Sequence, residues 1–158
     1  MKKTTLFIMM AVAVAMFAFT GCKKDDDSAG EDIALGYYVE GDYNGLVSYS
    51  VMGEMMNEVE TVVTLAKDVD NTISITLPTI GEGMLSIPEI SLSEVVISTT
   101  DKVVFTIEET EINTTIETTN YVGTVKGVVD GDNLTLDYSI KPGAMPMSID
   151  FAFTGEKE

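Results

Sequence analysis

The segment LTLDYSI at residues 134–140 alternates strictly between apolar and polar side chains. Leu134, Leu136 and Tyr138 fall on one face of an extended chain, whereas Thr135 and Asp137 fall on the other. Side chains alternate between two faces in a β-strand but not in a helix. The segment therefore predicts an antiparallel strand with one face in a dry core and the other in water.

The same period of two continues in both directions from this segment. Apolar and polar positions alternate at residues 147–154, 122–129, 103–107, 72–77, 59–65 and 43–51. Between residues 90 and 97 the alternation shifts once, which indicates a bulge or bend near Ser93 and Glu94. Residues 108–119 are rich in Glu and Thr and predict either a polar edge strand or a long ordered loop. No window of the mature chain has a helical period.

Short segments rich in Asp, Asn and Gly separate the predicted strands. They lie at residues 54–57, 68–71, 100–101, 130–133 and 141–143. These residue types tolerate the positive φ of hairpin turns, so each strand should pair with the next. About eight such strands avoid free edges by closing on themselves. We therefore expect an all-β fold, a single antiparallel up-and-down β-barrel, although a two-sheet sandwich would satisfy the same pattern.

Three short motifs carry a family resemblance. GDYNGL at residues 41–46, GTVKG at 123–127 and IDFAFTG at 149–155 are similar to segments of the calycin-like, lipocalin-related β-barrel domains of bacterial surface lipoproteins. The likeness covers residues 41–156, and the two glycines of the second motif suit a sharply coiled strand of a small barrel. The resemblance implies a lipocalin-related barrel and no established activity.

The N-terminus has the layout of a secretory signal peptide. Lys2 and Lys3 precede an uncharged apolar run at residues 6–19, which is shorter than the ~20 residues of a membrane-spanning helix. Cys22, the only cysteine, follows Thr20 and Gly21. This arrangement resembles a bacterial lipobox, which implies removal of residues 1–21 and lipidation of Cys22. Acyl chains on Cys22 would then hold the protein in a membrane.

The residues behind the cysteine resemble the surface-export signal on lipoproteins of some Gram-negative gut anaerobes. The residues of this signal are Lys23, Lys24, Asp25, Asp26 and Asp27. Residues 22–35 are charged or small and predict a flexible acidic tether, and residues 36–158 predict the barrel domain. The expected location is the cell surface, anchored in the outer membrane.

Composition excludes several classes of function. The chain has no arginine and no histidine, and the predicted mature form keeps all 26 acidic residues and seven lysines, a net charge of −19. Nucleic-acid binding needs clustered cations, so we exclude it. Without histidine or a free thiol, the usual general bases, nucleophilic dyads and zinc ligands are absent from the sequence. We expect a protein that is not an enzyme and needs no cofactor.

Methionines supply the candidate ligand-binding residues. An eight-stranded barrel either fills its interior or holds one small ligand. The predicted ligand contacts, with Met52 as a further member of the cluster, are Met55, Met56, Met84, Met145 and Met147. Methionine adapts to irregular apolar shapes, so these side chains either meet a hydrophobic ligand at the barrel mouth or plug that end.

Other candidate sites have simpler explanations. The pairs Asp68/Asp70 and Asp130/Asp132 resemble the start of calcium loops, but neither continues with the glycine and distal glutamate of such a loop. Turn chemistry accounts for both pairs, so no metal site is predicted. The glutamates at residues 108–111 indicate a solvated face, and a sugar platform at residues 37–38 would more typically use tryptophan, which is absent.

Three functions are compatible with this sequence. The first is a surface-anchored lipocalin-like module that binds a small apolar or amphipathic ligand. The second is a non-catalytic interaction or structural subunit of a nutrient-uptake or adhesion assembly, with a solid barrel and recognition through loops or the polar strand at residues 108–119. The third, a hydrolase that uses carboxylates alone, is disfavoured by the composition. The sequence names no protein partner.

Overall fold

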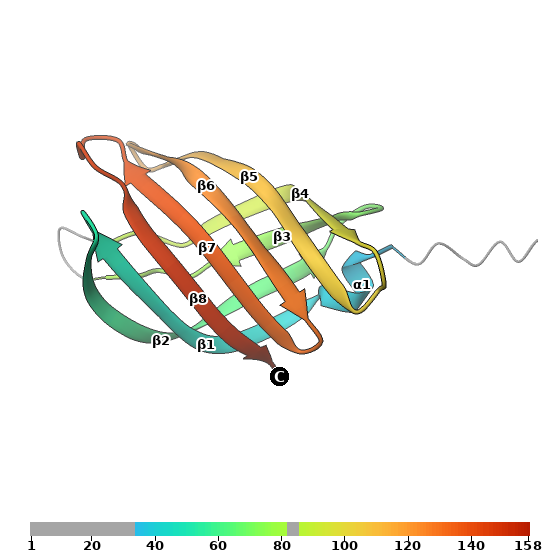
Figure 1. Cartoon of the computed structure of the whole chain (residues 1–158). Coiled ribbons are helices and arrows are strands. Elements are labelled where there is room, and N and C mark those ends of the chain that lie inside the picture. The colour runs from blue at the N-terminus through green and yellow to red at the C-terminus, as the bar shows by residue number, and fades with distance from the viewer. Residues whose placement is uncertain (1–33, 82–85) are drawn as a thin grey trace, which may run out of the picture. The chain divides into compact units, whose positions relative to one another are not determined.

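The computed structural model describes residues 34–81 and 86–158 (Figure 1). The predicted signal peptide, Cys22, the export signal and Met84 lie outside these residues. A short helix precedes eight strands: α1 (Gly36–Val39), β1 (Gly41–Val51), β2 (Glu54–Lys67), β3 (Thr72–Leu77), β4 (Ile90–Thr99), β5 (Val104–Ile116), β6 (Thr119–Asp130), β7 (Asn133–Pro142) and β8 (Ile149–Lys157). Among the described residues, no helix is long and apolar enough to cross a bilayer.

The strands form a closed antiparallel barrel in chain order. Each strand pairs with the next, and β1 also pairs with β8, with Val47 opposite Phe153. This confirms the up-and-down barrel and rules out the two-sheet sandwich. The expected bulge is also present, because Glu94 has a φ of 57° and the pairing of β3 with β4 shifts between Ile73 and Ile75.

Three details of the sequence prediction are wrong. Residues 54–57 belong to β2, and the turn before them is Met52–Gly53, both with positive φ. Val103 is 57% exposed and lies in the β4–β5 turn, because Asp101 Oδ1 accepts hydrogen bonds from the backbone N–H groups of residues 103 and 104 there. Helix α1 was not expected, since four residues are too few to show a helical period.

The polar segment at residues 108–119 is a strand for most of its length. It continues β5 to Ile116 and pairs with β6 through a two-residue turn at residues 117–118. Of the two alternatives, the polar edge strand is therefore right and the long loop is wrong. The pairing of β5 with β4 ends at Ile107, so the rest of β5 lies at an edge of the sheet. This position explains why the segment has few apolar residues.

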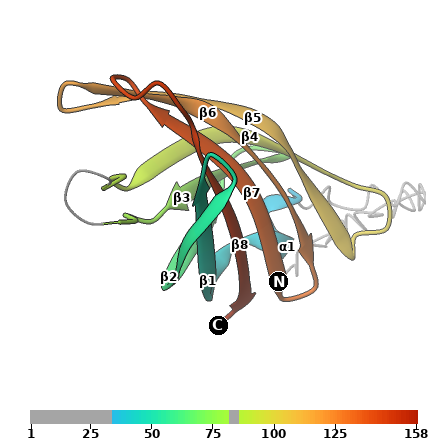
Figure 2. The ribbon, with the colours of Figure 1, turned by 60° about the vertical axis from the view of Figure 1, so that its left-hand side comes forward.

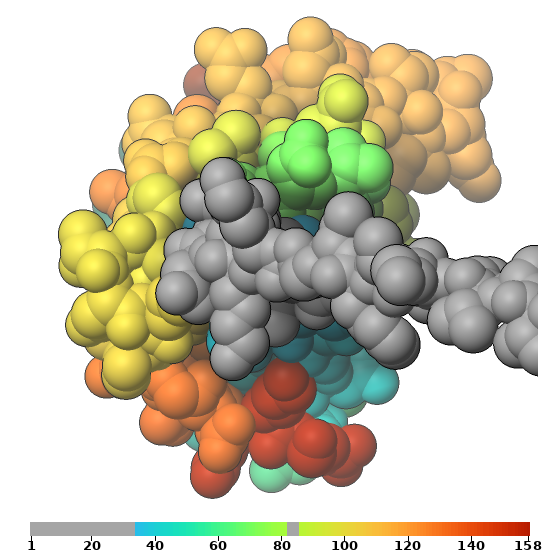
Figure 3. All heavy atoms as spheres, turned by 90° about the vertical axis from the view of Figure 1, so that its right-hand side faces the viewer, coloured from blue at the N-terminus to red at the C-terminus, as the bar shows by residue number. Residues whose placement is uncertain are grey.

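The two ends of the barrel differ. One end carries α1, the turns at residues 68–71, 100–103 and 131–132, and the C-terminus (Figures 1 and 3). Val39 of α1 is fully buried there. The opposite end carries the β1–β2, β5–β6 and β7–β8 hairpins and the β3–β4 connection. In that connection, Ile80 and Ile87 form an isolated antiparallel bridge, and each is 3% exposed.

Apolar side chains from all eight strands fill the space between these ends. The inward positions follow the predicted alternation, as in Leu134, Leu136 and Tyr138 of β7 and Phe151 and Phe153 of β8. Among the described residues, no polar or charged residue other than tyrosine is buried. The hydrophobic effect therefore supplies most of the stability of the barrel.

Alkaline pH should destabilise the barrel through Tyr43. Its hydroxyl donates a hydrogen bond of 2.8 Å to the Val39 carbonyl oxygen, and burial, with a smaller contribution from Asp132, raises its pKa from 10.0 to about 12. The unfolded chain loses this proton first, so stability is constant below about pH 10 and falls as pH rises toward 12.

Urea unfolding at several pH values, with Tyr43→Phe as the comparison, tests this expectation. At neutral pH the variant should be less stable by about 1 kcal/mol, because it lacks the hydrogen bond. The stability difference between the two proteins should shrink above pH 10. A difference that is independent of pH would contradict the assignment to Tyr43.

Candidate functional site

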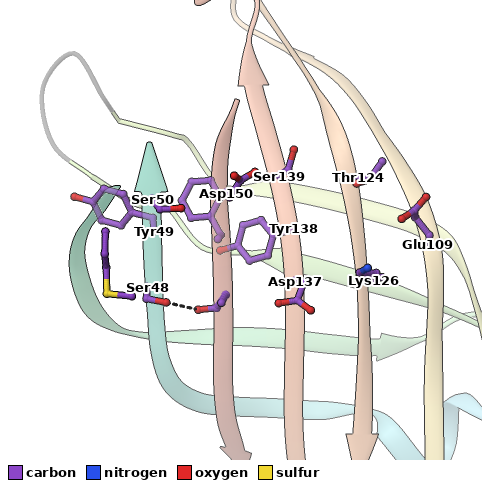
Figure 4. Close-up of a pocket in the computed structure, with 13 residues that line it drawn as sticks. Ser48, Tyr49, Ser50, Glu109, Thr124, Lys126, Asp137, Tyr138, Ser139 and Asp150 are labelled. Carbon is purple, nitrogen blue, oxygen red and sulfur yellow. Dashed lines mark hydrogen bonds between the residues drawn. The ribbon is translucent and has the colours of Figure 1, made fainter. Parts of the chain in front are cut away.

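A depression of about 420 Å³ lies on the outer face of the barrel, which we call the outer groove. Its lining residues come from six strands and are Ser48, Tyr49, Ser50, Met55, Glu109, Thr124, Lys126, Asp137, Tyr138, Ser139, Asp150, Phe151 and Ala152. Figure 4 shows the labelled side chains spread over β1, β8, β7, β6 and β5. Ten of the thirteen residues occupy outward positions of their strands. The other three, Tyr49, Tyr138 and Phe151, occupy inward positions and form the base of the groove.

Strand register aligns these outward side chains in two rows. Across β1, β8, β7 and β6, one row consists of Ser50, Asp150, Ser139 and Thr124. The second row consists of Ser48, Ala152, Asp137 and Lys126. Neighbouring members of a row are about 4.8 Å apart, the usual spacing of paired strands. Most of the floor is therefore short side chains, which leaves room above the strands.

The groove is polar with one apolar end. Hydroxyl groups on three strands can donate or accept hydrogen bonds. Asp137, Asp150 and Glu109 bring three carboxylates, whereas Lys126 is the single cation of the lining, so the groove has a formal charge of −2. Met55, 72% exposed, provides apolar surface at the β1–β2 side, and Ala152 of β8 adds apolar surface between Ser48 and Asp137. This lining suits an amphipathic molecule whose polar part is neutral or cationic.

Three aromatic rings lie beneath the groove on the inward face. The register places Tyr49 next to Phe151 and Phe151 next to Tyr138. The rings of Tyr138 and Phe151 stack with centroids 4.7 Å apart, and Tyr49 is tilted against Phe151 at 6.1 Å. This aromatic row forms the base of the groove, and contacts between the rings stabilise it.

Tyr138 carries an unusual hydroxyl group. The residue is 3% exposed, and its hydroxyl has no hydrogen-bond partner within the described residues. Burial raises the pKa of this phenol. An unsatisfied buried hydroxyl is destabilising, so Tyr138→Phe should leave the free energy of unfolding unchanged or raise it by about 1 kcal/mol.

Urea unfolding checks the Tyr138→Phe prediction, with Tyr43→Phe as the matched control. Both variants remove one buried phenolic hydroxyl, but only the hydroxyl of Tyr43 is hydrogen-bonded. A destabilised Tyr138→Phe variant would show that this hydroxyl has a partner in solution.

Residues 39–156 match the family described as the calycin-like β-barrel domain. The chain belongs to this family. The match covers β1 to β7 completely and nearly all of β8, so the whole closed barrel is the calycin-like domain. It confirms the resemblance seen in the sequence motifs at residues 41–46, 123–127 and 149–155.

The calycin-like chain is also similar to a solved structure. A crystal structure from Bacteroides fragilis, of a protein provisionally named as an outer membrane protein, aligns with a TM-score of 0.68 and 28% sequence identity. The alignment covers 78% of this chain but 52% of that one, so this chain spans about half the length of the protein it matches. No curated protein matches the chain.

The calycin-like barrel places the described methionines at one end. Met52 and Met56 of the β1–β2 hairpin are 80% and 53% exposed, whereas Met145 and Met147 in the β7–β8 connection are half-buried. The two segments are neighbours because β1 and β8 pair up to Val51 and Ile149. Within this set, only Met55 lines the outer groove. Met145 lines a separate depression of about 220 Å³ beside Ile87 and Tyr121.

The predicted carboxylate pairs lie in turns. Asp68 Oδ2 accepts a hydrogen bond of 3.3 Å from the Glu94 N–H, and Asp70 has a φ of 50°. Asp130 and Asp132 flank the β6–β7 turn, where the Asn133 side-chain amide donates to the Asp130 carbonyl oxygen. Turn geometry thus accounts for both pairs. Across residues 34–81 and 86–158, no three potential metal-ligating side chains are grouped together.

The tyrosines near α1 pack against the barrel. Tyr38 stacks on Phe105 with centroids 5.6 Å apart, and Lys67 Nζ lies 3.7 Å from the ring centroid of Tyr37. One face of each ring is therefore occupied by the protein itself. Glu108 accepts a 2.5 Å hydrogen bond from the Ser98 hydroxyl and is solvent-exposed, as the solvated-face interpretation of this segment predicts.

The sequence did not identify most residues of the outer groove. Ser48, Ser139 and Ala152 look like ordinary solvent-facing positions of separate strands. Their only common signal is small size, and it acquires meaning once the register places them side by side. Register between strands distant in sequence is not readable from alternation alone.

Proposed function

We propose that this calycin-like chain is a lipid-anchored binding protein of the outer membrane surface that holds a small amphipathic molecule in the outer groove. The observation that carries the proposal is the composition of the groove, which combines hydroxyl and charged groups over most of its floor with apolar surface from Met55 and Ala152. Its volume of about 420 Å³ falls within the range of small-molecule sites.

The packed interior supports the outer groove over a site inside the barrel. An interior ligand reached past the methionines would need open space between the inward side chains. The aromatic and aliphatic residues that face inward are almost fully buried, with Val125 and Phe153 at 0% and Phe151 at 4% exposed. Ile80 and Ile87 also cover part of the end that carries the methionines. The outer groove is therefore the better site.

Charge limits the class of ligand. The lining has a formal charge of −2 and the chain has a net charge of −17, so an anionic ligand would be repelled. A neutral or cationic head group would accept or donate hydrogen bonds at Ser139, Asp137 and Thr124. Its apolar part would contact Met55, whose flexible thioether adapts to different shapes.

The anchoring half of the proposal rests on Cys22 and on the place where the chain enters the barrel. The chain reaches the domain at α1, at the end opposite the β1–β2 and β7–β8 hairpins. A lipid on Cys22 would therefore tether the barrel through the segment that leads into α1. The name of the similar Bacteroides fragilis protein supports the same location.

Metabolic labelling with palmitate tests the anchor. The wild-type protein should incorporate label and remain with the membrane fraction, whereas Cys22→Ser should lose the label and the membrane association. Surface exposure follows if protease added to intact cells removes the barrel. Unlabelled wild-type protein would overturn the anchoring half of the proposal.

Calorimetric titration with three amphipaths tests the binding half. Dodecyl maltoside, dodecyltrimethylammonium and decanoate, each below its micellar concentration, offer neutral, cationic and anionic head groups. The first two should bind more tightly than the third. Ala152→Trp fills the groove from an exposed position, so it should weaken binding by about tenfold or more.

Thr135→Trp is the matched control for this titration. Thr135 is also an exposed outward position, lies on neighbouring β7 and does not line the groove. Binding should be unaffected by this change. Equal affinities of the wild type and Ala152→Trp, or preference for decanoate, would overturn the groove as the binding site.

A further inference from the structure

Strand β5 is paired on both sides for only part of its length. Pairing with β4 joins Ile97–Thr99 to Phe105–Ile107, whereas pairing with β6 continues to Ile116. Figure 2 shows the β5–β6 hairpin extending away from β4 toward its tip. From Thr110 to Ile116, β5 therefore has a recorded strand partner on one side only, within the part of the chain that the structure describes.

A β-bulge causes this divergence. The register of β5 against β6 shifts between Ile107 and Thr110, so Glu108 and Glu109 together face one residue of β6. A bulge increases local twist and turns the strand away from its former neighbour. Beyond the bulge the pairing with β6 is regular for seven residues, so this part of β5 forms a one-sided edge.

Hairpin geometry identifies the backbone groups along this edge. Ile116 and Thr119 close a two-residue turn, and the closing pair of such a turn exchanges hydrogen bonds. Alternate residues of β5, including Thr114 and Ile112, then also bond to β6. Thr115, Asn113 and Glu111 consequently direct their N–H and C=O groups to the unpaired side.

The negative charge along the edge favours a cationic partner. Between Lys102 and Lys126 the sequence contains four acidic residues, Glu108, Glu109, Glu111 and Glu117, and no basic residue. Acidic side chains on an edge oppose pairing with a second copy of this acidic chain. The same side chains attract an extended segment that carries Lys or Arg.

We propose that the outer edge of β5 at residues 109–116 accepts an extended cationic segment of another protein, which adds to the barrel as a further strand. Backbone hydrogen bonds at Glu111, Asn113 and Thr115 would supply affinity, and the glutamates would supply selectivity. The edge shares Glu109 with the outer groove, but Glu111, Asn113 and Thr115, whose backbone groups would pair with the added strand, do not line the groove.

Synthetic peptides provide the probe. We compare a nine-residue peptide of alternating Lys and Val with its Glu and Val counterpart, using the complete barrel domain with its tether. The cationic peptide should bind with an affinity that falls as salt rises, and the anionic peptide should not bind. In the complex, amide hydrogen exchange should slow at Glu111, Asn113 and Thr115. Protection elsewhere, or equal binding of both peptides, would overturn the proposal.

Two variants separate the backbone contribution from the charge contribution. Asn113→Pro removes an edge N–H that has no partner in β6, so the fold should persist while peptide binding weakens roughly fivefold to tenfold. Glu111→Lys should weaken the binding of the cationic peptide, whereas Glu156→Lys on the fully paired strand β8 should leave that binding unchanged. If Asn113→Pro fails to fold, the amide hydrogen exchange of the wild type in the complex still shows whether the peptide pairs with Glu111, Asn113 and Thr115. Dimerisation of the wild type through this edge would contradict the proposal that the edge accepts a segment of another protein.

Discussion

Replacing Gly123 by alanine is expected to lower the free energy of unfolding by about 3 kcal/mol, near the upper end of the cost of overpacking. Gly123 lies in β6 opposite Ile140 of β7. A β-carbon at this position would collide with the carbonyl oxygen and carbon of Ser139. Both are backbone atoms that the pairing of β6 with β7 holds in place, so they cannot rotate aside as a side chain would.

Equilibrium unfolding in urea measures this effect, with Thr124→Ala as the control. Thr124 is the next residue of the same strand and projects outward, so its truncation should change stability by about 0.5 kcal/mol or less. A Gly123→Ala variant as stable as the control would show that β6 and β7 are farther apart than described.

Truncation of Phe153 to alanine is the second change with a large expected effect, a loss of roughly 3–5 kcal/mol. Phe153 is fully buried and lies between Val47 of β1 and Leu136 of β7, where β8 closes the barrel. Its ring packs over Gly155, which has no side chain to refill the space. The change should therefore leave a cavity that its rigid neighbours cannot close.

Thermal and urea unfolding both report this loss, and Thr154→Ala provides the comparison. Thr154 is adjacent in sequence, exposed, and on the opposite face of β8. The total stability of a domain of this size is typically about 5–15 kcal/mol, so Phe153→Ala should unfold at far lower urea concentration. Similar midpoints for the two variants would contradict the central position of Phe153.

Much of the barrel could be predicted from the sequence because antiparallel strands with one wet face alternate visibly. The alternation at residues 134–140 and 72–77 corresponds to β7 and β3, and the parity shift near Glu94 corresponds to a real bulge. Features only a few residues long were missed. Helix α1 has four residues, and the turn at Met52–Gly53 lacks the Asp or Asn that marks other turns.

The candidate site was less predictable, for a different physical reason. The described methionines lie at one end of the barrel because β1 and β8 end at the same edge, and their contact with a ligand stays a prediction. The expectation of a ligand among them assumed interior space, which depends on how inward side chains pack and not on which residues they are. The outer groove arises from short side chains on four strands, and only the three-dimensional register brings them together.

Chemical-shift mapping of the ¹⁵N-labelled barrel with dodecyl maltoside tests the binding site most directly. We expect amide shifts to concentrate at Ser48, Ala152, Ser139 and Thr124, on the outer face of four adjacent strands. Ala152→Trp should abolish these shifts, and Thr135→Trp should preserve them. Shifts confined to inward residues such as Val125, or to the depression beside Met145 and Ile87, would contradict binding in the outer groove.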